Sequence, residues 1–131
     1  MKTRYAAAAA MVAGVLLGGV SVGALYAQGK APGAYVVVGL TEVDDMAAYK
    51  TNVIEKASPV VEKHGGRLLV RTNNITELRA ADPPIKRWIL IGFDNVQQAK
   101  SWYASEDMKP INAYINQHSK GRAFVVEAES R

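Results

Sequence analysis

Four short runs of this chain are almost continuously apolar: residues 35–40, 68–70, 88–93 and 124–126. A strand with one face in water alternates apolar and polar residues, whereas a strand covered on both faces is apolar throughout. We therefore predict four β-strands with both faces covered. The helices expected between them cover only one face of a sheet, so the second face needs a cover from outside the chain.

Two helical regions are expected to alternate with these strands. The first begins with Asp44 as its N-cap and carries apolar residues three and four positions apart, as one helix face requires. Pro59 lies within this pattern. Because proline is tolerated at a helix start and not in its middle, we expect a kink or a second short helix capped by Ser58. Gly65 is expected to end the region in the left-handed conformation.

The second helical region starts near Asn95 and continues in a further stretch that ends before Gly121. Between the second and third strands lies a polar loop, residues 73–84, with a short extended piece expected at residues 75–78. The predicted order is β, α, β, β, α, β. With two right-handed crossovers, this order gives an α+β, ferredoxin-like fold, in which a four-stranded antiparallel sheet carries both helical layers on one side.

The other face of that sheet has no cover in this arrangement. Exposed apolar patches of more than a few hundred Å² are rare in monomers. We therefore predict a homodimer in which the bare sheet faces of two copies pack together around a two-fold axis, closing a sandwich or barrel.

Residues 1–27 are predicted to be a secretory signal peptide. Lys2 and Arg4 precede a long uncharged run rich in Ala, Gly, Val and Leu, which are the charged and apolar regions of such a signal. The run is also long enough to span a bilayer, so an uncleaved anchor is the alternative. Its Ala and Gly content favours removal, after which no stable membrane insertion is expected.

The folded domain is expected to begin soon after the signal peptide. Cleavage after Ala27 is favoured over cleavage after Ala24, and both place a small residue at the cut. Residues 28–33 then form a short flexible terminus, because they contain several residues that break regular structure. Residues 34–131 form the single ferredoxin-like domain.

Composition excludes several classes of function. The chain of 131 residues has no cysteine, which excludes disulfides, thiolate nucleophiles and zinc sites built on sulfur. Lys2 and Arg4 are two of 16 basic residues against 12 acidic ones, so removal of the signal halves the formal net charge of +4. The other basic residues are scattered, whereas nucleic-acid binders concentrate positive charge on one face. We therefore predict no nucleic-acid partner.

Several short segments of the chain resemble one bacterial protein family. They are residues 34–38, 48–50, 64–71, 77–78, 91–94, 99 and 102–105. The pieces Gly-Gly-Arg-x-Leu-Val-Arg and Trp-Tyr-x-Ser are the most specific, and they are similar to the family known as domain of unknown function 1330. The resemblance covers nearly the whole mature chain and implies a dimeric α/β barrel. It also implies a bacterial host, in which the signal peptide leads to the periplasm or to secretion.

The chain departs from this family pattern at three places. Family members commonly carry a Glu near the end of the third strand, where this chain has Gly92, and a Gly pair where it has Thr72 and Asn73. Where family members carry a Ser-Pro-Glu-Tyr turn, this chain has Ser-Glu-Asp-Met at residues 105–108. If the Glu acts as a general acid or base in relatives, Gly92 cannot perform that role. The resemblance therefore leaves the activity open.

Candidate ligand-binding residues are those expected to line a cleft between the sheet and the helices. They are Tyr49, His64, Arg71, Glu77, Trp102 and Tyr103. Arg71 and Arg87 lie on neighbouring strands and together can clamp a carboxylate, although pairing with Glu77 or Asp82 is an equal alternative. Trp102 and Tyr103 also suit the core.

Neither histidine is expected to bind a metal. His64 and His118 are each placed near a helix C-terminus, where the helix dipole favours a protonated imidazole. They lie on different helices with no carboxylate at ligand spacing, so no metal site is predicted. No cofactor is predicted either.

Two classes of function are consistent with these features. The first is the binding of a small molecule in the cleft of each subunit, with no residue assigned to catalysis. The second is a structural or interaction protein of the cell envelope without ligand chemistry. Related barrels suggest a cofactor-free oxygenase or isomerase, but only by analogy of fold, so whether the protein is an enzyme stays open.

Overall fold

A computed structural model describes residues 31–129, and the predicted signal peptide lies outside them. The elements follow one another as β1 (Ala34–Val43), α2 (Met46–Tyr49), the π-helical turn η2 (Lys50–Ile54), α3 (Glu55–Lys63), β2 (Arg67–Thr72), β3 (Arg87–Phe93), α4 (Val96–Tyr103), the 3-10 turn η3 (Glu106–Met108), α5 (Lys109–His118) and β4 (Ser119–Glu127).

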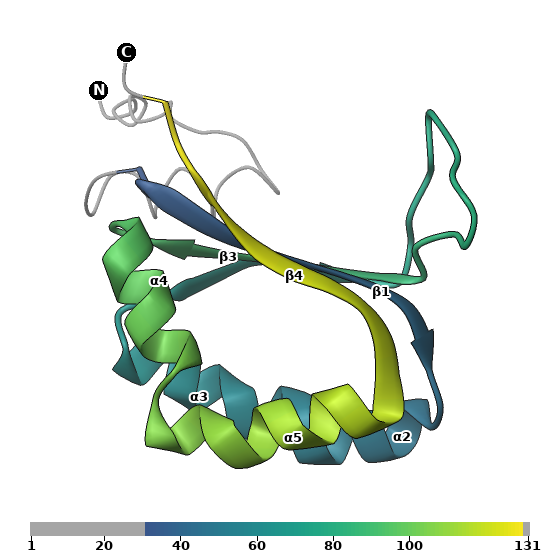
Figure 1. Ribbon diagram of the computed structural model, residues 1–131, viewed down its shortest axis with the longest axis horizontal. Coiled ribbons are helices and arrows are strands. Elements are labelled where there is room, and N and C mark those ends of the chain that lie inside the picture. The colour runs from purple at the N-terminus through teal and green to yellow at the C-terminus, as the bar shows by residue number, and fades with distance from the viewer. Residues whose placement is uncertain (1–30, 130–131) are drawn as a thin grey trace, which may run out of the picture. The chain divides into compact units, whose positions relative to one another are not determined.

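The four strands form one antiparallel sheet in the order β2-β3-β1-β4. The helices all lie on one side of this sheet (Figure 1). The predicted ferredoxin-like α+β fold is thereby confirmed. The sheet is open, with β2 and β4 at its edges.

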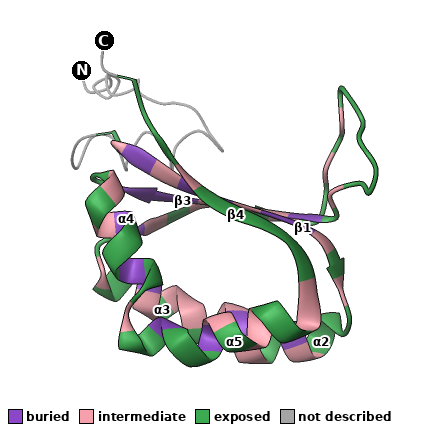
Figure 2. Cartoon of the chain, in the orientation of Figure 1, coloured by how far each residue is buried: buried purple, intermediate pink, exposed green. Residues whose placement is uncertain are grey.

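The core lies between the sheet and the helices. Alternate residues of β1 face opposite sides of the sheet, so Val36 and Leu40 join Phe93 of β3 in the cluster under the helices. The largest fully buried side chains are Tyr49, Phe93 and Met108, one each from α2, β3 and η3. Buried residues concentrate on β1 and β3, whereas β4 is mostly exposed (Figure 2).

The first helical region begins one residue later than the sequence predicted. Asp45 is the N-cap, and its carboxylate accepts the N–H of Ala48 at 3.0 Å. The prediction of Asp44 as the cap is wrong. Asp44 instead bonds the imidazole Nδ1 of His118 at 2.8 Å through its carboxylate, because β1 brings it beside the end of α5.

The irregularity expected at Pro59 occurs earlier in the chain. Pro59 lies inside α3, and the prediction that Ser58 caps a new helix is wrong, because the Ser58 hydroxyl donates to the Ile54 carbonyl at 3.0 Å. The helix widens instead at η2, where the N–H of Glu55 donates to the carbonyl of Lys50, five residues before it.

The loop between β2 and β3 contains no strand, so the extended piece predicted at residues 75–78 is wrong. Gly65 has a φ of +83°, which confirms the left-handed end of the first helical region. β4 begins at Ser119, directly after α5, and therefore includes Gly121, which was expected to precede it.

The sheet face opposite the helices carries exposed apolar side chains. Val70 is 38% exposed, Phe124 39% and Val126 42%. Their strand partners are Leu90, Val37 and Tyr35. These partners alternate along β1 and β3 with residues of the core, so they point to the sheet face opposite the helices. Among the described residues, no helix has the length and apolar character that crossing a membrane requires.

Candidate functional site

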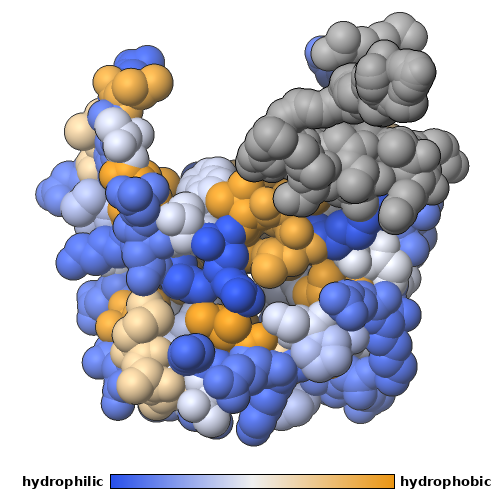
Figure 3. Space-filling view, turned by 180° about the vertical axis from the view of Figure 1, so that it is seen from behind, coloured by the Kyte–Doolittle hydropathy of each residue, from blue (hydrophilic) through white to orange (hydrophobic). Residues whose placement is uncertain are grey.

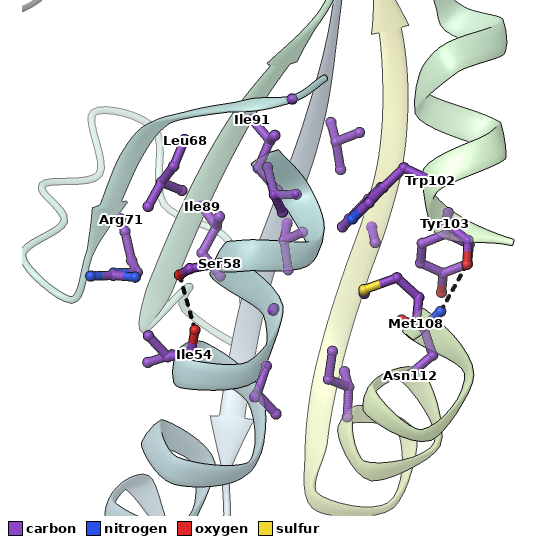
Figure 4. A pocket seen from close by; sticks show the side chains of 18 of the residues that line it. Ile54, Ser58, Leu68, Arg71, Ile89, Ile91, Trp102, Tyr103, Met108 and Asn112 are labelled. Carbon is purple, nitrogen blue, oxygen red and sulfur yellow. Dashed lines mark hydrogen bonds between the residues drawn. The ribbon is translucent and has the colours of Figure 1, made fainter. Parts of the chain in front are cut away.

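A hollow of about 490 Å³ lies between the sheet and the helices. Ligand pockets in proteins usually measure roughly 300–1,000 Å³, so its size suits a small organic molecule. Its walls are mostly aliphatic, with Val36, Val38, Leu68, Ile89 and Ile91 from the strands and Val53, Ile54, Val61, Met108 and Ile115 from the helical side. Figure 4 shows these side chains converging from both layers.

The π-helical turn η2 helps to shape this hollow. It follows Tyr49 directly, and its residues Val53 and Ile54 both line the cavity. The side-chain amide of Asn52 donates to the Ala48 carbonyl at 2.9 Å, which holds the widened turn. Such turns inside helices occur frequently at functional sites.

Trp102 brings an unusual polar group to the cavity. The side chain is 4% exposed and packs on Phe93, with ring centroids 5.5 Å apart. Its indole Nε1–H is buried and has no hydrogen-bond partner among residues 31–129, and the nitrogen faces the cavity in Figure 4. A buried donor without a partner costs about 1–3 kcal/mol. An acceptor that packs against the edge of the indole would therefore remove this cost.

Tyr49 lines the cavity near a buried guanidinium group. The Cζ of Arg87 lies 5.9 Å from the centroid of the Tyr49 ring, within the range of a cation–π contact. Burial raises the pKa of the Tyr49 hydroxyl, and the charge of Arg87 offsets part of this rise. The hydroxyl is therefore neutral at physiological pH.

Arg87 is the only buried charged residue in the described part of the chain, at 6% exposure. Its Nη1 donates to Oδ1 of Asn73 at 2.8 Å, and its buried Nε has no hydrogen-bond partner within residues 31–129. Burial lowers the pKa of Arg87, and the nearby Arg71 lowers it further. Arginine nevertheless keeps its proton in proteins, so the positive charge remains.

Arg71 stands at the opening of the cavity on the β2 side (Figure 4). It pairs with Ile89 across the strands, so Arg71 and Arg87 are diagonal neighbours on one face, about 7–8 Å apart at Cα. Among the described residues, neither guanidinium has a carboxylate within ion-pair distance. The alternative pairing with Glu77 or Asp82 is therefore not formed.

Glu77 and His64 do not line the cavity. The Glu77 carboxylate accepts the backbone N–H of Ile85 at 2.9 Å and of Ala81 at 3.3 Å, so it organises the loop between β2 and β3. His64 caps the end of α3, with Nε2 4.0 Å from Oδ2 of Asp107. The structure thus brings together the other four candidates, Tyr49, Arg71, Trp102 and Tyr103.

Sequence reasoning named four residues of the cavity wall as candidates and did not name the rest, of which three are instructive. Met108 and Asn112 are four residues apart across η3 and α5, and the side-chain amide of Asn112 donates to the Tyr103 carbonyl at 3.1 Å. Their helical spacing was a usable signal. Leu68, 43% exposed on β2, gave no such signal, because a bulge in the strand decides which way it faces.

Gly92 lies on the sheet face opposite the cavity. A Cβ there would meet Cγ of Pro32 at 2.7 Å and Cδ1 of Leu69 at 3.3 Å. A carboxylate at this position, as the family resemblance implies for relatives, would therefore not reach the cavity. Among residues 31–129, no cluster of His, Asp and Glu is suited to hold a metal ion.

A second hollow of about 310 Å³ adjoins the first beneath β4. The two share Val36, Trp102, Tyr103 and Ala123 as lining residues. Ala99, Lys100, Phe124 and Val125 complete the second wall. Trp102 therefore stands between two neighbouring apolar spaces.

Comparison with known proteins gives a family and a fold. Residues 33–129 match the family described as a domain of unknown function (DUF1330). The fold is similar to the crystal structure of RPA0582, a protein of unknown function from Rhodopseudomonas palustris, with a TM-score of 0.53 and 12% identity over 85% of this chain and 94% of that chain.

The crystal structure of methylated RPA0582 is similar as well, with a TM-score of 0.54 and 12% identity over 84% of this chain and 91% of that chain. At this identity the likeness concerns the fold alone. No curated protein matches the chain.

Proposed function

The chain belongs to the family described as a domain of unknown function (DUF1330), and we propose that it binds a small, largely apolar molecule in the cavity between its sheet and helices. The observation that carries this proposal is the buried Trp102 N–H, which faces the cavity and finds no partner among the residues that the structure describes. Buried polar groups in proteins are normally hydrogen-bonded. A ligand with a carbonyl oxygen would supply the missing acceptor.

The aliphatic walls supply the rest of the binding free energy. Each methylene that a ligand moves from water into the cavity contributes about 0.8 kcal/mol. The hydrogen bond to Trp102 adds only about 1 kcal/mol but fixes the position of the ligand. Tyr49, whose hydroxyl is neutral at physiological pH, lines the same cavity.

Export and self-association are part of the same proposal. The signal pattern of residues 1–27 supports a periplasmic or secreted protein. The exposed Val70, Phe124 and Val126 support a homodimer that buries the bare sheet face. The same exposed residues favour a second candidate function, a structural protein of the cell envelope that uses this face only for assembly.

The test uses Trp102 as its own reporter. The chain has two tryptophans, and Trp88 pairs with Gly39 on the opposite sheet face, so Trp88→Phe leaves Trp102 as the only indole. Titration of this variant with decanamide should change the indole emission and raise the Tm, because a ligand that binds only the native state stabilises it.

Trp102→Phe keeps an aromatic ring but removes the N–H. We expect it to weaken decanamide binding about fivefold, the value of one neutral hydrogen bond, as measured by calorimetry. Trp88→Phe is the matched control and should keep the affinity of the natural chain. The proposal is refuted if decanamide and its shorter and longer homologues leave the Tm unchanged, or if folded Trp102→Phe binds decanamide as tightly as the natural chain.

A further inference from the structure

We propose that the natural ligand is an aliphatic carboxylate, with its head group at Arg71, its chain along the aliphatic walls and a second oxygen atom on that chain accepting the Trp102 N–H. This inference rests on the proposed function and adds the charge and the orientation of the ligand. The unbalanced positive charge at the β2 end of the cavity supports the head group, and the buried indole N–H supports the second oxygen.

The β2 end of the cavity carries unbalanced positive charge. Arg71 lines the opening, and Arg87 lies diagonal to it on the neighbouring strand. No carboxylate of residues 31–129 lies within 4.0 Å of either guanidinium. The one acidic residue in the wall, Glu62, is exposed on α3. An anion is therefore favoured over a cation at this end.

The two arginines have different roles in this arrangement. Arg87 is buried, with Nη1 bonded to Asn73 and its cationic plane near Tyr49, so it has little freedom to reach a ligand. Arg71 is exposed at the opening, and its guanidinium can form two parallel hydrogen bonds to a carboxylate. Arg71 therefore contacts the ligand, and Arg87 contributes positive potential from behind Tyr49.

Arg71 and Trp102 stand on opposite sides of the cavity with aliphatic side chains between them (Figure 4), which indicates an elongated chain. The second hollow shares Trp102 and Val36 with the first and adds Ala99 and Val125 to the apolar surroundings of the indole. From behind, the molecule shows hydrophobic side chains gathered between the sheet and the helices with hydrophilic ones around them (Figure 3), as a chain with a polar head requires.

The experiment compares decanoate with decanamide, which has the same length but no charge. Calorimetry on the natural chain at low ionic strength should give decanoate at least about tenfold tighter binding, the value of one charge-assisted hydrogen bond. Affinity should rise by up to about fourfold for each methylene from hexanoate to decanoate, since each buried methylene contributes about 0.8 kcal/mol.

Arg71→Gln should remove the preference, so that decanoate binds no more tightly than decanamide. Arg79→Gln is the matched control, because Arg79 is exposed in the loop between β2 and β3 and does not line the cavity. It should keep the preference, and circular dichroism would verify that both variants are folded.

Each other outcome has a separate meaning. Equal binding of decanoate and decanamide would overturn the carboxylate inference while the proposed cavity function stands. A preference that survives in Arg71→Gln would overturn the placement of the head group. If neither compound binds, both the inference and the proposed function fail.

Discussion

Ala57→Leu tests directly whether the space between sheet and helices is open. Ala57 lies on α3, lines the cavity and packs against the core. A leucine there places an isobutyl group in the hollow of about 490 Å³ without removing any existing contact. In a well-packed core the same change would cost about 1–3 kcal/mol through overpacking.

The magnitude follows from the added apolar atoms. Three buried carbons are worth about 2 kcal/mol of transfer free energy at about 0.8 kcal/mol each. The side-chain entropy lost by leucine is about 0.5–1 kcal/mol, and its helix propensity is close to that of alanine. We therefore expect Ala57→Leu to raise the free energy of unfolding by about 1 kcal/mol and to weaken decanamide binding.

The assay is urea unfolding followed by circular dichroism, with decanamide titrated in parallel. Ala47→Leu is the control, because Ala47 is exposed on α2 and exposed substitutions usually change stability by less than about 0.5 kcal/mol. A loss of about 1 kcal/mol or more in Ala57→Leu would show that the hollow is already filled, and the cavity hypothesis would then be abandoned.

Three further predictions concern the core, the pH dependence and the sheet face. Gly66→Ala should lower the free energy of unfolding, measured by urea unfolding, by about 1–3 kcal/mol. The new Cβ would lie 2.7 Å from Cζ of Phe93 and 2.8 Å from Cγ1 of Val61, and unchanged stability would contradict this overpacking. Burial raises the pKa of the Tyr49 hydroxyl above 10.0 in the folded protein. The stability that the neutral hydroxyl contributes is therefore complete below pH 10.0, and it is lost as the pH rises through the pKa that Tyr49 has in the folded state. Tyr49→Phe should flatten that alkaline loss in thermal melts, and an unaltered profile would count against the buried hydroxyl. Val126→Lys should turn a dimer into a monomer in analytical ultracentrifugation, whereas a natural chain that is already monomeric would refute the dimer.

The fold was predictable because its strands are marked by nearly continuous apolar runs. The order of strands and helices followed from those runs and from the breaks at Gly65 and near Asn95. These features are local, and the right-handed crossover rule converts their order into a topology. Boundaries were less certain: Asp44 and Asp45 are both good caps, and only the position of His118 beside β1 decides between them.

The candidate site was only partly predictable, because the sheet face toward which a strand side chain points depends on the strand register. Leu68 and Arg71 are an odd number of residues apart and would face opposite sides in a regular strand. A bulge between Leu68 and Val70 places both on the cavity side, opposite Ile91 and Ile89. No residue type in β2 indicates this bulge. Periodicity alone therefore could not identify Leu68 and Arg71 as side chains on the cavity side.

Hydrogen bonds between residues distant in the sequence determine which of the remaining candidate side chains can bind a ligand. Glu77 has the chemistry of a ligand-binding residue, yet its two oxygens are used by the backbone of Ala81 and Ile85. The unpaired N–H of Trp102 was equally invisible, because satisfaction of a donor depends on every residue packed around it. Such information belongs to tertiary structure.

The π-helical turn η2 has a consequence for how the cavity could change in evolution. A π turn closes its hydrogen bond over five residues rather than four, so it accommodates one additional residue within a helix. Deletion of Thr51 would restore an α-helical turn and rotate the preceding residues by about 100° relative to α3. Tyr49 would then leave its contact with Arg87, so a single-codon deletion would take this side chain out of the cavity wall while the sheet and the other helices keep their sequence.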